Sequence, residues 1–170
     1  MLNDHCSRLG PIQDERVRRL NEASLKNGRY VLYWMQASPR TEYNHALEYA
    51  VEKANELNRP LVAFFGITGS FPEANERSYW FMLEGLREAK KSLEERGIQL
   101  VVWIKSPEKG VLELSREASL LVGDRGYLKI QRKWYEYLVG KASCPFIQVE
   151  TNVVVPVETA SSKEEYSAAT

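Results

Sequence analysis

The chain has 170 residues, of which 44% are hydrophobic and 27% charged, with 23 basic and 23 acidic side chains. Such values are typical of one soluble globular domain, and the balanced charge provides no global field for a nucleic-acid or membrane partner. There is neither an apolar run long enough for a membrane helix nor a signal peptide, and the two cysteines lack metal or redox spacing, so we expect a cytoplasmic protein.

The N-terminal part has two segments of different character. Residues 1–10 are polar and unpatterned, which predicts a flexible tail. Pro11 precedes apolar residues at roughly helical spacing, and Asp14 and Glu15 stand where the dipole of a new helix favours negative charge. We therefore expect a helix that ends near residue 28. Its arginines lie on more than one face, which favours a solvated helix and leaves a phosphate-contacting arm as the alternative.

A strand, a polar loop and a helix follow, as at the start of a βαβ unit. Residues 30–35 form a short apolar run rich in aromatic and β-branched side chains, which is typical of a strand buried on both faces. Pro39 interrupts the loop 36–40, and from Thr41 the apolar positions recur with the helical period to about residue 57. The loop therefore lies at the carboxyl end of a strand, where open α/β sheets bind ligands.

Strands and helices continue to alternate along the chain. Apolar runs predict four further strands, at 61–67, 100–104, 119–122 and 146–149. Helical periodicity predicts three further helices, at 76–96, about 106–118 and 128–139, with Gly97 ending the first of these. We expect residues 152–157 to be extended and a last helix to start near residue 161. The alternation predicts an α/β fold: a Rossmann-like, doubly wound, five-stranded parallel sheet with helices on both faces.

Few residues indicate catalysis. There is no Walker loop, and no G-x-G-x-x-G follows the first strand, so we do not expect a pyrophosphate on the first helix. His45 has no second ligand at metal spacing and is interpreted as a surface or interface residue. Cys144 has no base nearby in sequence and is interpreted as a small core residue. The glycines around Asp124 and Arg125 predict either a close approach to a ligand or a simple turn, and spacing alone does not choose.

Several segments together resemble the amino-terminal domain of class II DNA photolyases, which repair cyclobutane pyrimidine dimers. The resemblance covers nearly the whole chain from about Arg16, and its segments are YWMQASPRTEYNHALEYA, EANERSYWFMLEGLREAKKSLEERGI, DRGYLKIQRKW and QVETNVVVPVETASSKEEYSAAT. The resemblance implies a domain that can hold an antenna pigment, a deazaflavin or another flavin. It also implies that a carboxy-terminal helical domain, absent from this chain, binds FAD and splits the dimer.

An antenna needs no nucleophile or acid, because energy transfer by dipole coupling makes no bond. It needs a rigid pocket for one ring system, and the aromatic residues that mostly build the core also suit a flat conjugated ligand. We expect the pocket at the strand ends, with Gln36 hydrogen-bonded to a ring edge and Arg40 or Lys129 paired with an anionic group. The predicted lining is Met35, Gln36, Ala37, Ser38 and Arg40 on one side, and Asp124, Arg125, Gly126, Tyr127 and Lys129 on the other.

The resemblance divides the chain into a tail at 1–10, an antenna domain at 11–152 and, at 153–170, a linker toward the helical FAD domain. That domain is the expected partner in cis, and damaged DNA would be reached only through the longer protein. We therefore expect no dimer splitting by this chain alone and weak DNA binding, since zero net charge releases few counterions. Two alternatives remain, a stand-alone flavin- or nucleotide-binding protein and a docking module for a separate FAD protein.

Overall fold

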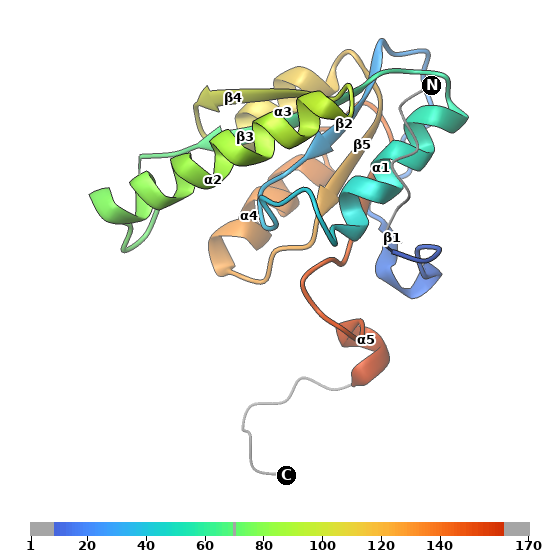
Figure 1. Cartoon of the computed structure of the whole chain (residues 1–170). Helices are drawn as coiled ribbons and strands as arrows, with labels where there is room; N and C mark the ends of the chain where they lie inside the picture. The colour runs from blue at the N-terminus through green and yellow to red at the C-terminus, as the bar shows by residue number, and fades with distance from the viewer. Residues whose placement is uncertain (1–8, 70, 162–170) are drawn as a thin grey trace.

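A computed structural model of the chain describes residues 9–69 and 71–161, and within these ranges six strands form one sheet (Figure 1). The strand order is β1-β6-β5-β2-β3-β4, and all neighbouring pairs are parallel except β1 with β6. The strands are β1 (Val17–Arg19), β2 (Tyr30–Trp34), β3 (Leu61–Ile67), β4 (Gln99–Ile104), β5 (Ala118–Asp124) and β6 (Phe146–Val149).

Two helices cover each face of the sheet, which confirms the doubly wound architecture. On one face, α1 (His45–Glu56) and α2 (Glu76–Glu95) pack against the core around Tyr33 and Phe65. On the other, α3 (Pro107–Ser115) and α4 (Lys129–Val139) pack against the core around Trp34 and Phe146. The central strands are buried on both faces, which explains their continuous apolar runs. None of the helices in the described ranges could cross a membrane.

The predicted helix between Pro11 and residue 28 is wrong. The segment forms a short 3-10 helix η1 (Asp14–Arg16), then β1, and then an irregular stretch. Strand β1 pairs antiparallel with β6, Val17 opposite Val149, and adds the sixth strand that the sequence did not predict. Backbone hydrogen bonds to a strand that lies far away in the chain have overridden the local helical spacing.

The first sheet helix starts later than predicted, at His45 rather than Thr41. The side chain of Asn44 accepts a hydrogen bond from the N–H of Leu47 at 3.0 Å, which makes Asn44 the N-cap. The Asn44 amide also donates to the Tyr33 hydroxyl at 2.8 Å, a bond that fixes the helix start on β2. The residues before the cap therefore belong to the loop that follows β2.

Other boundaries shift less. The predicted strand 119–122 extends to Ala118–Asp124, and the predicted helix 106–118 ends at Ser115. Gly97 follows α2 with a positive φ of 74°, which is the conformation expected of a glycine that ends a helix. The extended segment after β6 ends in a short helix α5 (Val157–Ala160). The predicted tail lies outside the described residues except for its last two, as does the predicted last helix beyond Ser161.

Candidate functional site

The sheet order reverses between β2 and β5, and at their carboxyl ends Asp124 meets the loop that follows β2. Oδ1 of Asp124 accepts hydrogen bonds from the backbone N–H groups of Gln36 at 3.1 Å and Ala37 at 3.0 Å. Oδ2 accepts from the N–H of Ser38 at 2.5 Å. Asp124 is fully buried, and burial raises the pKa of its carboxyl while the three donors oppose that rise. The carboxyl group thus closes the switch point instead of leaving it open.

Aromatic packing makes this edge of the sheet rigid. The ring of Trp34 stacks on that of Tyr135 with centroids 4.8 Å apart, and Tyr135 stacks in turn on Phe146 at 5.3 Å. The Tyr135 hydroxyl donates to the backbone carbonyl of Asp124. A Cβ at Gly123 would lie 2.5 Å from that hydroxyl, so the close approach of α4 to β5 requires glycine at this position.

An apolar cavity of about 240 Å³ lies beside the closed switch point, over the carboxyl ends of β2 and β3. Thr68, Phe71 and Ala74, which lie between β3 and α2, and the first turns of α2 form its other walls, and Gln131 of α4 reaches it. Most of its lining is apolar: Pro39, Phe65, Ile67, Phe71, Ala74 and Met82. Such a cavity offers a flat ring a mostly apolar contact surface, and the polar residues in its lining are Gln36, Thr68, Ser78, Tyr79 and Gln131.

Gln36 is the predicted pigment ligand that lines this cavity, and its amide is held in place. Its Oε1 accepts from Trp34 Nε1 and from the backbone N–H of Gly66, both at 3.2 Å. Its Nε2 donates to the Gly66 carbonyl, also at 3.2 Å. An amide nitrogen carries two hydrogens, so this arrangement leaves Nε2 one further N–H to offer a ligand.

The other predicted site residues lie in several places. Met35, directly after β2, and Ser38, in the loop, are buried, and Ala37 is half-buried in the same loop. Arg40 lines a separate surface depression and donates to Asn152 at 2.9 Å. Lys129 is exposed in the first turn of α4. A second cleft, on the side of α4 that faces β1 and β6, is lined by Arg125, Gly126 and Tyr127.

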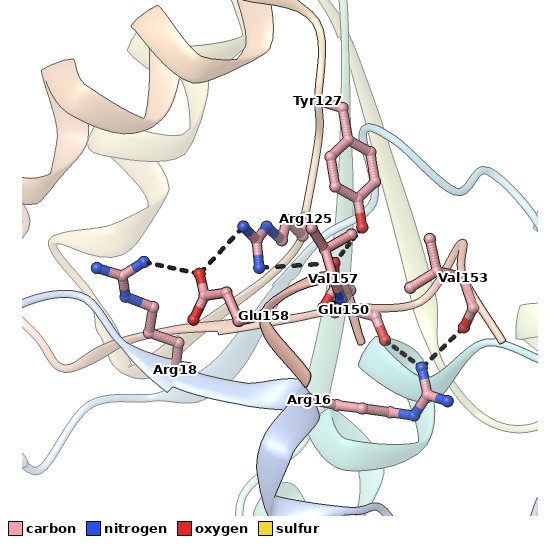
Figure 2. A network of polar contacts seen from close by, with 8 residues as sticks. All are labelled: Arg16, Arg18, Arg125, Tyr127, Glu150, Val153, Val157 and Glu158. Carbon is pink, nitrogen blue, oxygen red and sulfur yellow. Dashed lines mark hydrogen bonds and ion pairs between the residues drawn. The ribbon is translucent and has the colours of Figure 1, made fainter. Parts of the chain in front are cut away.

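A polar network around Glu150 was not predicted from the sequence (Figure 2). Glu150 is buried at the end of β6, accepts from the Tyr127 hydroxyl and from the N–H of Val157 at 3.2 Å, and lies 3.5 Å from Arg125. Burial, followed by the bond to Glu150, raises the pKa of the Tyr127 hydroxyl. A charged residue directly after a buried strand is the sequence signal for such a network.

Arg16 completes the network from the N-terminal side. Its guanidinium donates to the backbone carbonyls of Glu150 at 3.2 Å, Val153 at 2.9 Å and Val154 at 2.6 Å. The side chain is buried, so the bond to Glu150 is shielded from water, and the bonds to Val153 and Val154 are partly shielded. Arg16 therefore fixes the path of the chain after β6.

Chemically reactive side chains are few and dispersed. Cys144 is a free, buried thiol, as the sequence indicated, and burial raises its pKa to about 11. His45 is half-buried at the start of α1. Within residues 9–69 and 71–161, no three His, Cys, Asp or Glu side chains are grouped so that they could hold a metal ion.

Comparison with known proteins adds three matches. A sequence model of the DNA photolyase family matches residues 31–170. The deoxyribodipyrimidine photo-lyase of Methanothermobacter thermautotrophicus is 55% identical over 161 residues, which is 94% of this chain and 36% of that protein. The corresponding protein of Arabidopsis thaliana is 33% identical over 144 residues, 82% of this chain and 29% of that protein. The chain spans about a third of the length of these curated relatives.

A solved structure matches the fold. The archaeal photolyase of Sulfolobus tokodaii superimposes with a TM-score of 0.63 at 18% identity, over 74% of this chain and 30% of that one. Its crystal structure contains two FAD molecules and is described as implying a novel light-harvesting cofactor. At this level of identity the match establishes the Rossmann-like fold alone.

Proposed function

The chain belongs to the DNA photolyase family, and we propose that it forms the amino-terminal light-harvesting domain of a class II cyclobutane pyrimidine dimer photolyase. The 55% identity to a deoxyribodipyrimidine photo-lyase, over about a third of that protein, supports a role as one domain of a larger enzyme. In this proposal residues 11–152 form the antenna domain and residues 153–170 lead toward the FAD domain. Dimer splitting and most of the DNA contact belong to that second domain.

The pigment ring is proposed to bind in the apolar cavity beside Gln36. This observation carries the proposal, because the cavity combines a mostly apolar lining, which includes Phe65 and Phe71, with the fixed amide of Gln36. Small-molecule sites usually enclose about 300–1,000 Å³, and this cavity measures about 240 Å³. Because the cavity is smaller than a usual site, only the ring system of the deazaflavin or flavin enters the cavity, and its ribityl chain remains outside.

Within this proposal the ten predicted residues divide into three roles. Gln36 contacts the pigment directly through its remaining N–H. Met35, Ala37, Ser38 and Asp124 support the wall that holds Gln36, since Asp124 fixes the backbone of that loop. The others lie outside the cavity, and these are Arg40, Arg125, Gly126, Tyr127 and Lys129.

Reconstitution tests the pigment site. The purified chain is titrated with riboflavin and with a deazaflavin, and binding is followed by the shift of pigment absorption and the change of its fluorescence. Ala74→Trp fills the cavity and is expected to abolish both signals, and Gln36→Leu is expected to weaken binding about 5–10-fold through loss of one hydrogen bond. Lys91→Trp, exposed on the C-terminal half of α2, is the control. Unchanged spectra with both pigments would refute the site.

The domain partner is proposed to cover an apolar face next to the cavity. On the N-terminal half of α2, Trp80 and Phe81 are 62% and 81% exposed, and at the end of β4 Ile104 is 88% exposed. Figure 1 shows this half of α2 extending past the carboxyl end of β4. Helix α2 packs against β4, and large apolar side chains exposed on adjoining elements mark an interaction surface. Since nearly two-thirds of the Methanothermobacter relative lies outside the matched region, we assign this face to that remaining part.

A chimera tests the docking face. This chain replaces the matching region of the Methanothermobacter photolyase, and Phe81→Glu is introduced both in the chimera and in the isolated chain. The melting temperature is expected to fall in the chimera and to stay unchanged in the isolated chain, where Phe81 is already exposed. Lys91→Glu is the control. The assignment would be contradicted if the chimera melted at the same temperature with and without Phe81→Glu. It would also be contradicted if the isolated chain self-associated and Phe81→Glu abolished that self-association.

A further inference from the structure

The cleft beside α4 has a chemical character unlike that of the pigment cavity. It encloses about 570 Å³ between β1, the loop after β5 and α4. Three arginines from these three elements line it, Arg18, Arg125 and Arg132. Its apolar lining includes Leu20, Val139 and the ring of Tyr135. Guanidinium groups beside an apolar floor suit a ligand with an anionic group attached to an organic body.

Two of these arginines already converge on one oxygen atom (Figure 2). Oε1 of Glu158, in α5, lies 3.4 Å from Nη1 of Arg18 and 3.2 Å from Nη2 of Arg125. The carboxylate thus occupies a position that two guanidinium groups can reach together. The Glu158 side chain is 63% exposed, and an exposed ion pair contributes little to stability. An incoming anion can therefore displace it.

The position of Arg125 in the cleft is fixed before any ligand binds. The side chain of Arg125 is held from behind by Glu150, which the Tyr127 hydroxyl and the N–H of Val157 fix in turn. Arg132 is exposed on α4 at the same cleft. When Glu158 is displaced, the positive charges of three arginines exceed the negative charges of the two carboxylates at the cleft, Glu136 and Glu150. The local charge then favours an anion.

We propose that this cleft binds a phosphomonoester, with Arg18 and Arg125 holding the phosphate and Glu158 acting as a competing internal anion. A phosphate carries up to two negative charges and several acceptor oxygens, so it satisfies two guanidinium groups better than one carboxylate oxygen does. The apolar floor contacts the organic group that the phosphate carries. The site is separate from the pigment cavity and does not depend on the antenna proposal.

Calorimetric titration with matched probes tests the site. Inorganic phosphate and adenosine 5′-monophosphate are expected to bind, and adenosine is not. Glu158→Gln is expected to tighten binding about 5-fold, the equivalent of about 1 kcal/mol, because the competing carboxylate is removed. Arg18→Gln is expected to weaken binding at least about 10-fold. Arg18 is exposed at the edge strand, so its removal should leave the fold intact, which circular dichroism checks.

Control variants separate this proposal from its rivals. Arg29→Gln removes an exposed arginine elsewhere and should not change phosphate binding, and Ala74→Trp should block the pigment without affecting phosphate. The proposal is overturned if adenosine binds as well as its monophosphate, or if neither Glu158→Gln nor Arg18→Gln changes the affinity. The proposal is also overturned if single-stranded DNA binds through Arg18 and more tightly than the mononucleotide does, because the cleft would then be a nucleic-acid site.

Discussion

The carboxyl group of Asp124 accepts a hydrogen bond from the backbone N–H of Ser38, and through it β5 is bonded to the loop after β2. Together with the N–H groups of Gln36 and Ala37, three successive donors converge on one side chain. Successive backbone N–H groups of this kind commonly bind anionic ligands. Here a carboxyl group of the chain itself occupies that position, so the ligand cavity lies to one side of the switch point.

Asp124→Asn is predicted to destabilise the fold by about 2–3 kcal/mol. The asparagine oxygen can still accept from two N–H groups, but its NH₂ group would face the third, which leaves a buried donor unsatisfied. The measurement is the free energy of unfolding from urea titration followed by circular dichroism. Asp14→Asn, at an exposed position in η1, should change stability by less than about 0.5 kcal/mol. Equal midpoints for the two variants would contradict the assigned role of Asp124.

Arg16→Met is predicted to release the chain after β6. The substitution keeps the apolar stem but removes three charge-assisted bonds to the carbonyls of Glu150, Val153 and Val154, at a cost of about 2–3 kcal/mol. Hydrogen exchange of the Val157 amide, which donates to Glu150, should accelerate more than exchange in the central strands.

Arg29→Met is the matched control for Arg16, because the guanidinium of Arg29 forms an exposed ion pair with Glu117. It should leave the exchange of the Val157 amide unchanged. If the two variants accelerate exchange equally, Arg16 does not fix this segment.

The five parallel strands could be predicted from the sequence because each contains a continuous apolar run, and all of them except the edge strand β4 are largely buried. The edge strand Val17–Arg19 could not, because its three residues include two exposed arginines and its hydrogen bonds join it to β6. Local spacing contains no information on a partner so distant in the chain. Alternation of strands and helices was enough to place the loop 36–40 at the switch point.

The candidate site was harder to predict than the fold. A polar residue at a strand end, such as Asp124, is equally typical of a ligand contact and of a bond to the backbone, and sequence does not reveal which way the side chain turns. The cavity depends on how Phe71 and Ala74, in the polar loop between β3 and α2, lie over the end of β3. The aromatic Phe71 within that polar loop was the available signal, since such a residue usually packs against something.

Cys144 is predicted to react slowly with thiol reagents while the chain is folded. Only the thiolate reacts, and a pKa of about 11 leaves about one thiol in a thousand ionised at pH 8. In a Cys6→Ser background, the rate of labelling by a disulfide reagent at pH 8 should rise at least about 100-fold in denaturant, where the thiol regains a pKa near 8.5. Similar rates for folded and unfolded chains would show that Cys144 is accessible.

His45 is predicted to make the fold less stable as the pH falls below neutrality. Burial, and then the charges of Arg16 and Arg40, lower the pKa of its imidazole in the folded chain. The helix start, which disfavours a positive charge, acts in the same direction. Its Nδ1 is buried without a hydrogen-bond partner among the described residues.

The free energy of unfolding depends on pH because the folded and unfolded chains bind protons with different affinities at His45. Below the ordinary histidine pKa of about 6.5 the unfolded chain takes up a proton that the folded chain resists, so the free energy of unfolding decreases from there down to the lowered pKa of the folded state and then levels off. His45→Gln should therefore gain stability relative to the wild type between pH 7.5 and pH 5.5, in urea titrations at each pH. Parallel stability curves for the two proteins would show that His45 titrates alike in both states, and the burial at the start of α1 would then have no electrostatic consequence.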